Sequence, residues 1–303
     1  MKESSAIAQA FRTCEKIAFR HYENFPVASY LIPKSKRKYV AAIYAFARTA
    51  DDIADEEGLQ EDVRLKKLSE LEQKLRDCIS SRASDPVFVA LAETVARFDL
   101  PITHLLDLLV AFRMDVEKKR YADWGELLTY CSLSANPIGR LILHLFGYDG
   151  EERLHASDAI CTALQLTNFW QDLSLDVKRN RIYLPLEDMK KFNCTAEDLL
   201  QQRYNGNFRS LMLHEVEKTV LLFELGKPLL NSVGRDLRFQ LRLTWLGGMR
   251  ILQKIQRTNY DVFRQRPTIS AWDKCYLIVQ AIGRRGEKKG LQSLGADNIH
   301  QEV

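Results

Sequence analysis

Two acidic stretches, far apart in the chain, hold the residue types and spacings best suited to chemistry. The first contains Asp51, Asp52 and Asp55, and the second contains Asp172 and Asp176. Apolar residues recur at helical spacing through both stretches, so the carboxylates at i and i+4 share one helix face. Carboxylates held roughly 4–6 Å apart repel by about 4 kcal/mol at an effective dielectric constant of about 20. Two such pairs predict a bound cation.

Mg²⁺ suits these pairs best, because it accepts one or two carboxylates and shares the rest of its shell with water and substrate phosphates. Mn²⁺ is an alternative that takes the same oxygen donors. One acidic motif alone is most often a solvated surface, but two matched motifs favour a site. The side chains predicted to bind the metal are Asp51, Asp55, Asn168, Asp172 and Asp176, with Asp52 assisting.

Basic and polar side chains that suit a diphosphate accompany both carboxylate pairs. Arg48 lies one helical turn before Asp51, where its guanidinium could hold a phosphate oxygen. Carboxylates, bridging metals and basic side chains together neutralise a diphosphate and make it a better leaving group. The predicted diphosphate-binding residues are Arg48, Gln165, Asn168, Arg181 and Tyr183, and the predicted catalytic residues are Tyr44, Asp51, Asp52, Asp55, Asp172 and Asp176.

Other common catalytic systems leave no pattern in the sequence. The chain has neither a GxxxxGK[ST] phosphate-binding loop nor a GxGxxG fingerprint, so a P-loop kinase and a nicotinamide cofactor are not expected. The six histidines show no metal-ligand spacing and the six cysteines form no CxxC pair, which argues against a zinc site. Such cysteines indicate a reducing, cytoplasmic compartment rather than a disulfide scaffold.

The composition is that of an ordinary globular protein. Of 303 residues, 46% are hydrophobic and 28% are charged, and a net charge of +4 predicts no binding to nucleic acid. No signal peptide opens the chain, and no apolar run is long enough to span a bilayer. Basic residues gather at 34–38 and 284–289, where they form either a solvated surface or an attraction to an anionic membrane.

Helical periodicity extends through most of the chain, whereas sustained alternation typical of strands is missing. We predict one all-α domain with its core at about residues 6–285, a polar tail at 286–303, and a helical bundle around a deep central cavity. Expected helix boundaries include a cap at Asp85, a capping box at Thr195, and stops at Gly58 and Gly147. The predicted helices are residues 6–21, 36–54, 63–78, 86–98, 103–118, 126–146, 153–176, 208–226, 235–255 and 271–282.

A diphosphate that departs from an allylic or cyclopropylcarbinyl carbon leaves a carbocation behind. Such a cation needs an apolar, aromatic-lined pocket that controls the access of water. Several aromatic residues lie close to the motifs, although each of them alone is more often core packing. They are Phe25, Tyr30, Tyr44, Phe46, Phe112, Tyr130, Phe146, Phe169, Trp170 and Tyr260.

Taken together, these motifs resemble the squalene/phytoene synthase family, which has an all-α isoprenoid synthase fold. Residues 44–55 match the family's first aspartate-rich motif, and residues 165–185 resemble its second. Residues 114–131 resemble its middle segment, and residues 259–267 resemble a late segment that ends a helix. The resemblance runs from about residue 21 to residue 282, and it implies an Mg²⁺-dependent enzyme that acts on a prenyl diphosphate.

Three departures from the condensing members are similar to the hydroxysqualene synthase branch of bacterial hopanoid pathways. Residues 24–26 (Asn-Phe-Pro) replace a Ser-rich stretch, residues 136–137 (Asn-Pro) replace a Gly-rich turn, and Gln171 replaces an arginine. By that resemblance the substrate is presqualene diphosphate, and water captures the rearranged cation to give hydroxysqualene. Gln171 fits a site that holds a single diphosphate, or it packs against Trp170.

Two other functions stay open. One is a head-to-head condensing enzyme that makes presqualene diphosphate, squalene or phytoene. The other is a non-catalytic helical protein for binding or assembly, although a scaffold gains nothing from carboxylates that repel. The resemblance further implies a lipid diphosphate substrate, other hopanoid-pathway enzymes as partners, and a cytoplasmic protein in peripheral contact with the inner face of the cytoplasmic membrane.

Overall fold

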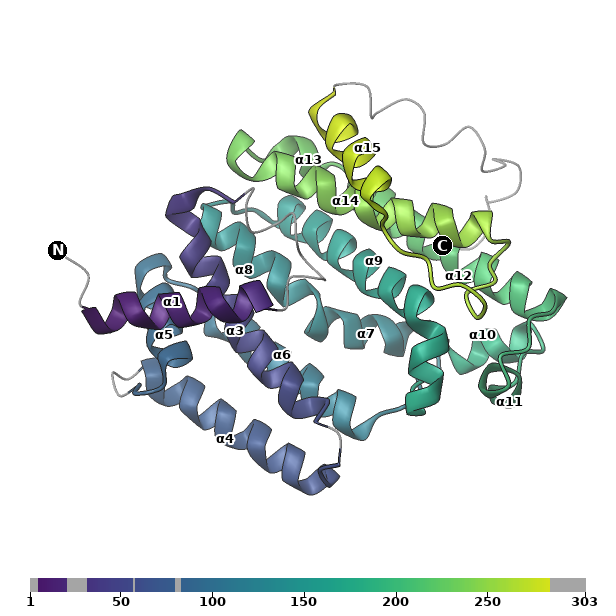
Figure 1. Cartoon of the computed structure of the whole chain (residues 1–303), viewed down its shortest axis with the longest axis horizontal. Helices are drawn as coiled ribbons and strands as arrows, with labels where there is room; N and C mark the ends of the chain where they lie inside the picture. Colours follow the sequence, from purple (N-terminus) through teal and green to yellow (C-terminus); the bar gives the residue numbers. More distant parts are fainter. Residues whose placement is uncertain (1–4, 21–31, 57, 80–82, 284–303) are drawn as a thin grey trace.

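The computed structural model describes residues 5–20, 32–56, 58–79 and 83–283, and these residues form helices and no strands, as predicted. The expectations for residues 24–26, for Tyr30, for the basic residues 284–289 and for the tail at 286–303 lie outside the described residues. The helices are α1 (Ser5–Arg20), α3 (Lys34–Ala54), α4 (Glu61–Ile79), α5 (Pro86–Phe98), α6 (Ile102–Glu117), α7 (Trp124–Ser134), α8 (Asn136–Phe146), α9 (Glu151–Asp176), the 3₁₀ turn η1 (Val177–Arg179), α10 (Leu186–Lys191), α11 (Ala196–Leu200), α12 (Gly206–Gly226), α13 (Leu229–Ser232), α14 (Arg235–Arg257) and α15 (Ala271–Ile282) (Figure 1).

Most helix boundaries follow from the capping residues seen in the sequence. The side chain of Asp85 accepts a hydrogen bond from the backbone N–H of Val87, and Thr195 forms a complete capping box with Asp198. Gly147 ends α8 in the left-handed region at φ 78°, which a glycine adopts without strain. Gly58 also has a positive φ, but α3 already ends at Ala54, so the predicted stop there is wrong by one turn.

The predicted helix at residues 126–146 is wrong, because it is two helices. α7 ends at Ser134 and α8 begins at Asn136, with Ala135 between them at φ −118° and ψ −47°. Pro137 has no backbone N–H to donate and its ring clashes with the preceding turn, so one continuous helix cannot pass through it. The capping box at Thr195 marked the start of α11 but not its extent, and α10 and α13 were not predicted, since each of these helices is too short to show helical periodicity.

α9 is the central helix and packs against α7, α8, α12 and α14 (Figure 1). Its contact with α12 is close because α12 ends in Gly226, where a Cβ would lie 2.4 Å from Cγ1 of Ile160. The indole of Trp170 is completely buried on this side and donates a hydrogen bond to Oγ1 of Thr219 over 2.8 Å. These contacts fix the rotation of α9 about its axis. They therefore fix the direction of its polar face, called the α9 stripe, which carries Gln165, Asn168, Asp172 and Asp176.

An apolar cavity of about 360 Å³ lies between α1, α3, α8, α9 and α14, which confirms the predicted central cavity. Its wall is mostly aliphatic, and Phe19 and Tyr44 supply the rings among its described lining residues. The expectation of an aromatic lining is therefore wrong for side chains such as Phe46 and Trp170, which are fully buried in the core. Helical spacing alone does not separate a pocket wall from a core.

Candidate functional site

α3 and α9 each run from the cavity wall to an acidic end. On α3, Tyr44 and Ala47 line the cavity, and Asp51 follows one turn after Ala47. On α9, Cys161 and Leu164 line the same cavity before the acidic end of the helix. The predicted carboxylates on both helices therefore lie toward one end of one cavity.

A direct contact joins the two acidic ends. Nη2 of Arg181 donates a hydrogen bond to Oδ1 of Asp55 over 2.7 Å, and only 14% of the arginine side chain is exposed. The backbone N–H of Arg181 donates to the carbonyl oxygen of Asp176, which ties this residue to the end of α9. The structure thus brings the first and second predicted motifs together, with Arg181 between them.

Three carboxyl groups here have raised pKa values, and burial is the largest cause for each. The pKa of Asp51 is raised by burial and then by the charge of Asp55. The pKa of Asp176 is raised to about 7 by burial and then by the charge of Asp172, while Arg181 lowers it. The pKa of Asp115 on α6 is raised to about 7 by burial. Burial therefore disfavours the charged forms of these carboxyl groups, and for Asp51 and Asp176 a neighbouring carboxylate adds to that cost.

In the first motif, Arg48 forms ion pairs with carboxylates on its own helix. Its guanidinium lies 3.1 Å from a carboxylate oxygen of Asp51 and 2.6 Å from one of Asp52. Asp52 is exposed and Asp51 is half-buried, so the two sit at different depths. Partial burial raises the pKa of the Tyr44 hydroxyl, which keeps this cavity-lining phenol protonated at neutral pH.

In the second motif, Asp172 is paired with an arginine from a distant part of the sequence. Nε of Arg266 donates a hydrogen bond to Oδ1 of Asp172. The side-chain amide of Gln171 donates to the carbonyl oxygen of Pro267 over 2.6 Å. Two consecutive residues of α9, Gln171 and Asp172, thereby bind the segment between α14 and α15. The side-chain amide of Gln171 is used in a hydrogen bond to a backbone carbonyl oxygen.

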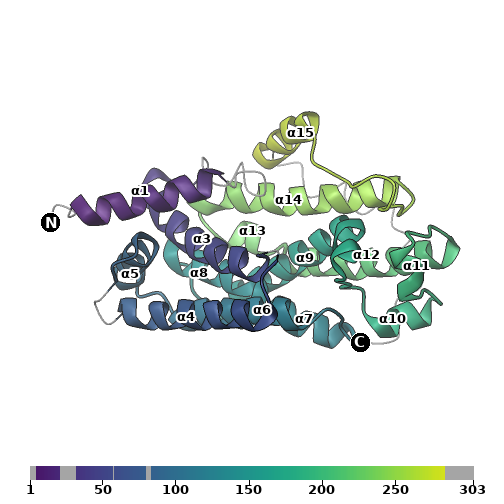
Figure 2. The same cartoon turned by 60° about the horizontal axis from the view of Figure 1, so that its bottom comes forward.

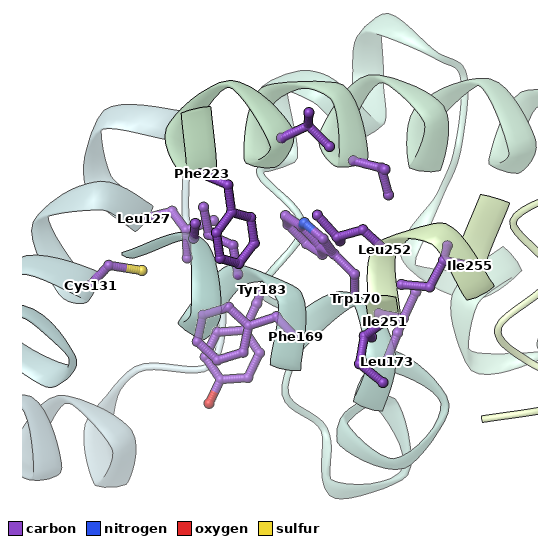
Figure 3. Close-up of a cluster of buried hydrophobic side chains, with 14 of the residues drawn as sticks. Leu127, Cys131, Phe169, Trp170, Leu173, Tyr183, Phe223, Ile251, Leu252 and Ile255 are labelled. Atoms are coloured by element: carbon purple, nitrogen blue, oxygen red, sulfur yellow. The ribbon is translucent and has the colours of Figure 1, made fainter. Parts of the chain in front are cut away.

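An aromatic stack supports the other side of the site. The rings of Phe169 and Tyr183 lie parallel with centroids 3.7 Å apart, and Figure 3 shows them stacked within the buried cluster around α9. Tyr121 stacks on Tyr183 at 5.7 Å, and the hydroxyl of Tyr130 donates to Oδ1 of Asp115 over 2.7 Å. Tyr183 is therefore packed against the rings of Phe169 and Tyr121, close to the charges of Asp115 and Arg181.

Two predicted residues lie on the α9 stripe without a described partner. Gln165 is half-buried and Asn168 is exposed, and Asn168 lies one turn before Asp172. Their roles in binding metal and diphosphate stay predictions. Asp115 and Arg266 were not predicted as site residues, and Tyr130 was named only as an aromatic residue close to the motifs, although all three fall in segments that carry the family resemblance. A lone acid or base without an i+4 partner gives no pattern of its own.

Within the described ranges, no three His, Cys, Asp or Glu side chains are grouped in the arrangement of a metal site. The nearest cations to the carboxylates are arginines, with Arg181 on Asp55 and Arg266 on Asp172. The donor chemistry nevertheless suits Mg²⁺, because the site offers hard carboxylate oxygens. In the part of the chain that the structure describes, no helix combines the length and hydrophobicity needed to cross a bilayer.

Comparison with known proteins gives a consistent family. A model of the squalene/phytoene synthase family matches residues 19–273. A hydroxysqualene synthase from Rhodopseudomonas palustris is 39% identical over 223 residues, which are 73% of this chain and 75% of that protein. A phytoene synthase from Arthrospira platensis is 29% identical over 303 residues, which are 94% of this chain and 96% of that protein.

A solved structure has the same fold. The structure of squalene synthase HpnC from Alicyclobacillus acidocaldarius matches with a TM-score of 0.81 and 37% identity, covering 85% of this chain and 97% of that chain. Its fold agrees with the helical architecture described above. The chain belongs to the squalene/phytoene synthase family, whose members are isoprenoid synthases that act on prenyl diphosphates.

Proposed function

We propose that this enzyme converts presqualene diphosphate to hydroxysqualene. The observation that carries the proposal is the Arg181–Asp55 contact, which joins two acidic helix ends beside one aliphatic cavity. A charged end suits a diphosphate, and an aliphatic cavity suits a long hydrocarbon chain. The identity to a hydroxysqualene synthase, at 39%, supports this branch of the family over the phytoene synthase at 29%.

The predicted metal ligands supply the means of neutralising the leaving group. When bound, Mg²⁺ adds positive charge beside the diphosphate oxygens and makes the diphosphate a better leaving group. The side chains that would hold it are Asp51, Asp55, Asn168, Asp172 and Asp176. Burial, and then a neighbouring carboxylate, raise the pKa values of Asp51 and Asp176, and a bound divalent cation would offset both costs.

The arginines bind and orient the diphosphate from both helices. Arg48 comes from α3, and Arg181 follows α9, so the two guanidinium groups approach the leaving group from different elements. Arg181 would give up its contact with Asp55 to hold a diphosphate oxygen, and Asp55 would then be available as one of the residues that hold the metal. Tyr183 and Gln165 would contact the diphosphate, and Tyr44, which lines the cavity, would assist.

The reaction balances without an external reductant. The C–O bond to diphosphate breaks and its electron pair leaves with the diphosphate oxygen. The cyclopropylcarbinyl cation rearranges, a water oxygen forms the new C–O bond, and the proton of that water passes to the released diphosphate. The aliphatic wall limits the approach of other water molecules to the cation. A nicotinamide cofactor is therefore not required.

The test is to incubate the purified protein with Mg²⁺ and presqualene diphosphate, without a nicotinamide, and to analyse the products by mass spectrometry. We expect hydroxysqualene and diphosphate in equal amounts. Absence of substrate consumption would overturn the proposal. A nicotinamide-dependent release of squalene, with no alcohol formed, would also contradict it.

A head-to-head condensing activity is the second candidate, and the near full-length match to a phytoene synthase favours it. In that case the enzyme consumes farnesyl or geranylgeranyl diphosphate supplied alone. Inertness toward both would remove this candidate. The retained carboxylates and the family membership favour either enzyme over a non-catalytic binding protein.

A cytoplasmic location with peripheral contact at the inner membrane face remains part of the proposal, as do contacts with other hopanoid-pathway enzymes. The lipid nature of the substrate and product supports the membrane contact. Residues 34–38 support it less than their charge suggested. Nζ of Lys36 donates to the carbonyl oxygen of Leu145 over 2.7 Å, and Lys38 lies over the ring of Phe11.

A further inference from the structure

The outward face of α15 is unusually apolar for a surface helix. Four large apolar or aromatic side chains on it are strongly exposed, and we call them the α15 stripe: Trp272 is 87% exposed, Val279 70%, Ile282 69% and Tyr276 52%. At about 100° per residue these four fall within an arc of roughly 120°. The stripe is therefore one continuous surface and not a scatter of single exposed residues.

The opposite face of α15 is already buried. Asp273, Leu277 and Ala281 face inward, where Leu277 and Ala281 pack with Leu243 of α14. A helix with one buried face normally presents polar residues to water on the other. The charged residues of α15 are Asp273, which is buried, and Lys274, which lies outside the stripe. The helix is thus apolar on both sides, and the outer side calls for a second apolar environment.

Ion pairs hold α15 rigidly in this orientation. Oδ1 of Asp273 accepts a hydrogen bond from Arg250 over 2.7 Å, and Lys254 also pairs with this carboxylate. Ser270 forms a complete capping box with Asp273 at the start of the helix. Figure 2 shows α15 on the outside of the molecule, above α14. The stripe is therefore presented outward by a fixed helix that cannot simply roll over.

The helix beneath the stripe also forms part of the cavity wall. Leu237 and Leu241 of α14 line the cavity, whereas Leu243 of the same helix packs under α15. The stripe and the proposed substrate cavity are consequently separated by α15 and α14. Whatever binds the stripe is brought to within about two helix diameters, roughly 20 Å, of the cavity.

We propose that the α15 stripe docks on the surface of an anionic lipid bilayer. Trp and Tyr beside aliphatic side chains are the composition of helices that lie in a membrane interface. The sequence continues past the described residues with Arg284, Arg285, Lys288 and Lys289, whose charges suit anionic headgroups. Docking of the stripe on a bilayer does not depend on the proposed function. Only its benefit to the enzyme does, since a lipid substrate would reach the cavity from the bilayer.

A second copy of the chain fits the stripe less well. α15 has 12 residues and is about 18 Å long, so its outer face covers roughly 200 Å². A stable protein interface buries about 800 Å² on each partner. An interfacial helix needs no such area beyond its own face, because it inserts its apolar side among the lipids.

The test is flotation of the full-length protein with vesicles, in the absence of substrate. The vesicles are phosphatidylcholine alone, or phosphatidylcholine and phosphatidylglycerol in equal amounts. We expect binding to the anionic vesicles and a fall of about tenfold or more for the Trp272→Ser/Val279→Ser variant. The matched control is Leu221→Ser/Leu225→Ser on α12, where the replaced leucines are 55% and 67% exposed. The control variant should float like the unmodified protein.

A second readout places the contact at α15 itself. Cys275 is exposed on this helix, whereas Cys14, Cys78, Cys131 and Cys194 are buried. An environment-sensitive fluorophore on Cys275 should shift to shorter wavelength with anionic vesicles.

Equal flotation of the stripe variant and the unmodified protein, or an equal loss in the α12 control, would overturn the inference. A lipid-free dimer that the stripe variant abolishes would assign the surface to a second copy instead. Because no substrate is used, these outcomes are independent of whether the protein forms hydroxysqualene.

Discussion

Arg181 binds Asp55 through a 2.7 Å hydrogen bond, and this pair connects the segment after α9 to the end of α3. The same guanidinium lowers the pKa values of Asp115 and Asp176 through its charge. One arginine therefore balances carboxylates from three helices. Burial raises the pKa values of Asp115 and Asp176, and the charge of Arg181 opposes that rise, so it increases the ionised fraction of both at neutral pH.

Replacing Arg181 should therefore change both the rate and its pH dependence. For Arg181→Gln we expect kcat for presqualene diphosphate to fall by about 100-fold or more, the usual scale for a lost electrostatic contact to a developing charge. Loss of the guanidinium charge raises the pKa values of Asp115 and Asp176 further. The acid limb of the pH–rate profile should then move to higher pH, which a titration of kcat/KM measures.

The matched control for Arg181 is Lys178→Gln, which removes a positive charge from an exposed position in the same segment. This variant should keep its rate within about twofold, because exposed charges are screened by water and salt. If Lys178→Gln and Arg181→Gln lose activity equally, then net positive charge matters here and the specific position of Arg181 does not.

Asp176→Asn should lose activity and gain stability in the absence of metal. The pKa of Asp176 is raised by burial and by Asp172, so its charge is held at a cost that an amide avoids. We expect a rate loss of about 100-fold or more. Mg²⁺ should raise the melting temperature of the unmodified protein, because a ligand that binds the native state stabilises it. That increase should largely vanish in the variant.

Asp149→Asn is the control, since this exposed acid lies before α9, at the opposite end from the site. It should leave both the rate and the Mg²⁺-dependent melting shift unchanged. A rate loss below tenfold for Asp176→Asn, or an undiminished Mg²⁺ shift, would remove Asp176 from the proposed metal ligands.

Filling the cavity should block the substrate without disturbing metal binding. Ala47 lines the cavity one turn before Asp51, so Ala47→Phe places a ring where the hydrocarbon would lie. We expect turnover of presqualene diphosphate to fall by about tenfold or more. The new ring and the hydrocarbon chain would compete for the same space, and overpacking is costly. The Mg²⁺-dependent melting shift should persist, because the carboxylates are intact.

Ala47→Ser serves as the control for size, and it should retain near-normal turnover. Unchanged turnover in Ala47→Phe would show that the reacting chain does not occupy this cavity. Loss of the Mg²⁺ shift in the same variant would instead indicate that the ring had disturbed the acidic end.

The site was predictable from sequence to the extent that its residues lie on long helices with regular spacing. Asp51 and Asp55, and Asp172 and Asp176, each repeat on one face, and their helices are long enough for periodicity to be unambiguous. Arg181 could be named because it follows the second pair closely. What the sequence did not contain was the pairing of Arg181 with Asp55, which depends on how two distant helices pack.

Residues that are brought to the site by tertiary packing could not be predicted from the sequence. Asp115 on α6 has no acidic residue three or four positions away, and Arg266 lies in a connection between helices, so neither has a spacing that marks it. The break at Ala135 was visible in the sequence as Pro137, but the apolar pattern continues through it and favoured a single helix. The aromatic residues failed as pocket predictions because core and pocket walls share the same residue types.

A buried acid away from the site makes stability itself dependent on pH. Glu215 on α12 is completely buried, and burial raises its pKa from 4.5 to about 8. Its carboxyl lies 3.4 Å from Lys218, whose ammonium group donates a hydrogen bond to Asp188 over 2.8 Å. Lys218 is therefore shared between two acids and compensates Glu215 only partly.

The unfolded chain releases the proton of Glu215 above about pH 4.5, whereas the folded chain keeps it until about pH 8. The contribution of Glu215 to stability is therefore complete below pH 4.5, falls as the pH rises toward 8, and stays lost above that. Glu215→Gln removes this pH dependence. Between pH 5 and pH 8 the free energy of unfolding of the variant, relative to that of the unmodified protein, should therefore rise by a few kcal/mol. Urea unfolding of both proteins at several pH values measures the difference, which also cancels the contributions of Asp115 and Asp176. A difference that is independent of pH would mean that Glu215 is already ionised in the folded protein and fully compensated by Lys218.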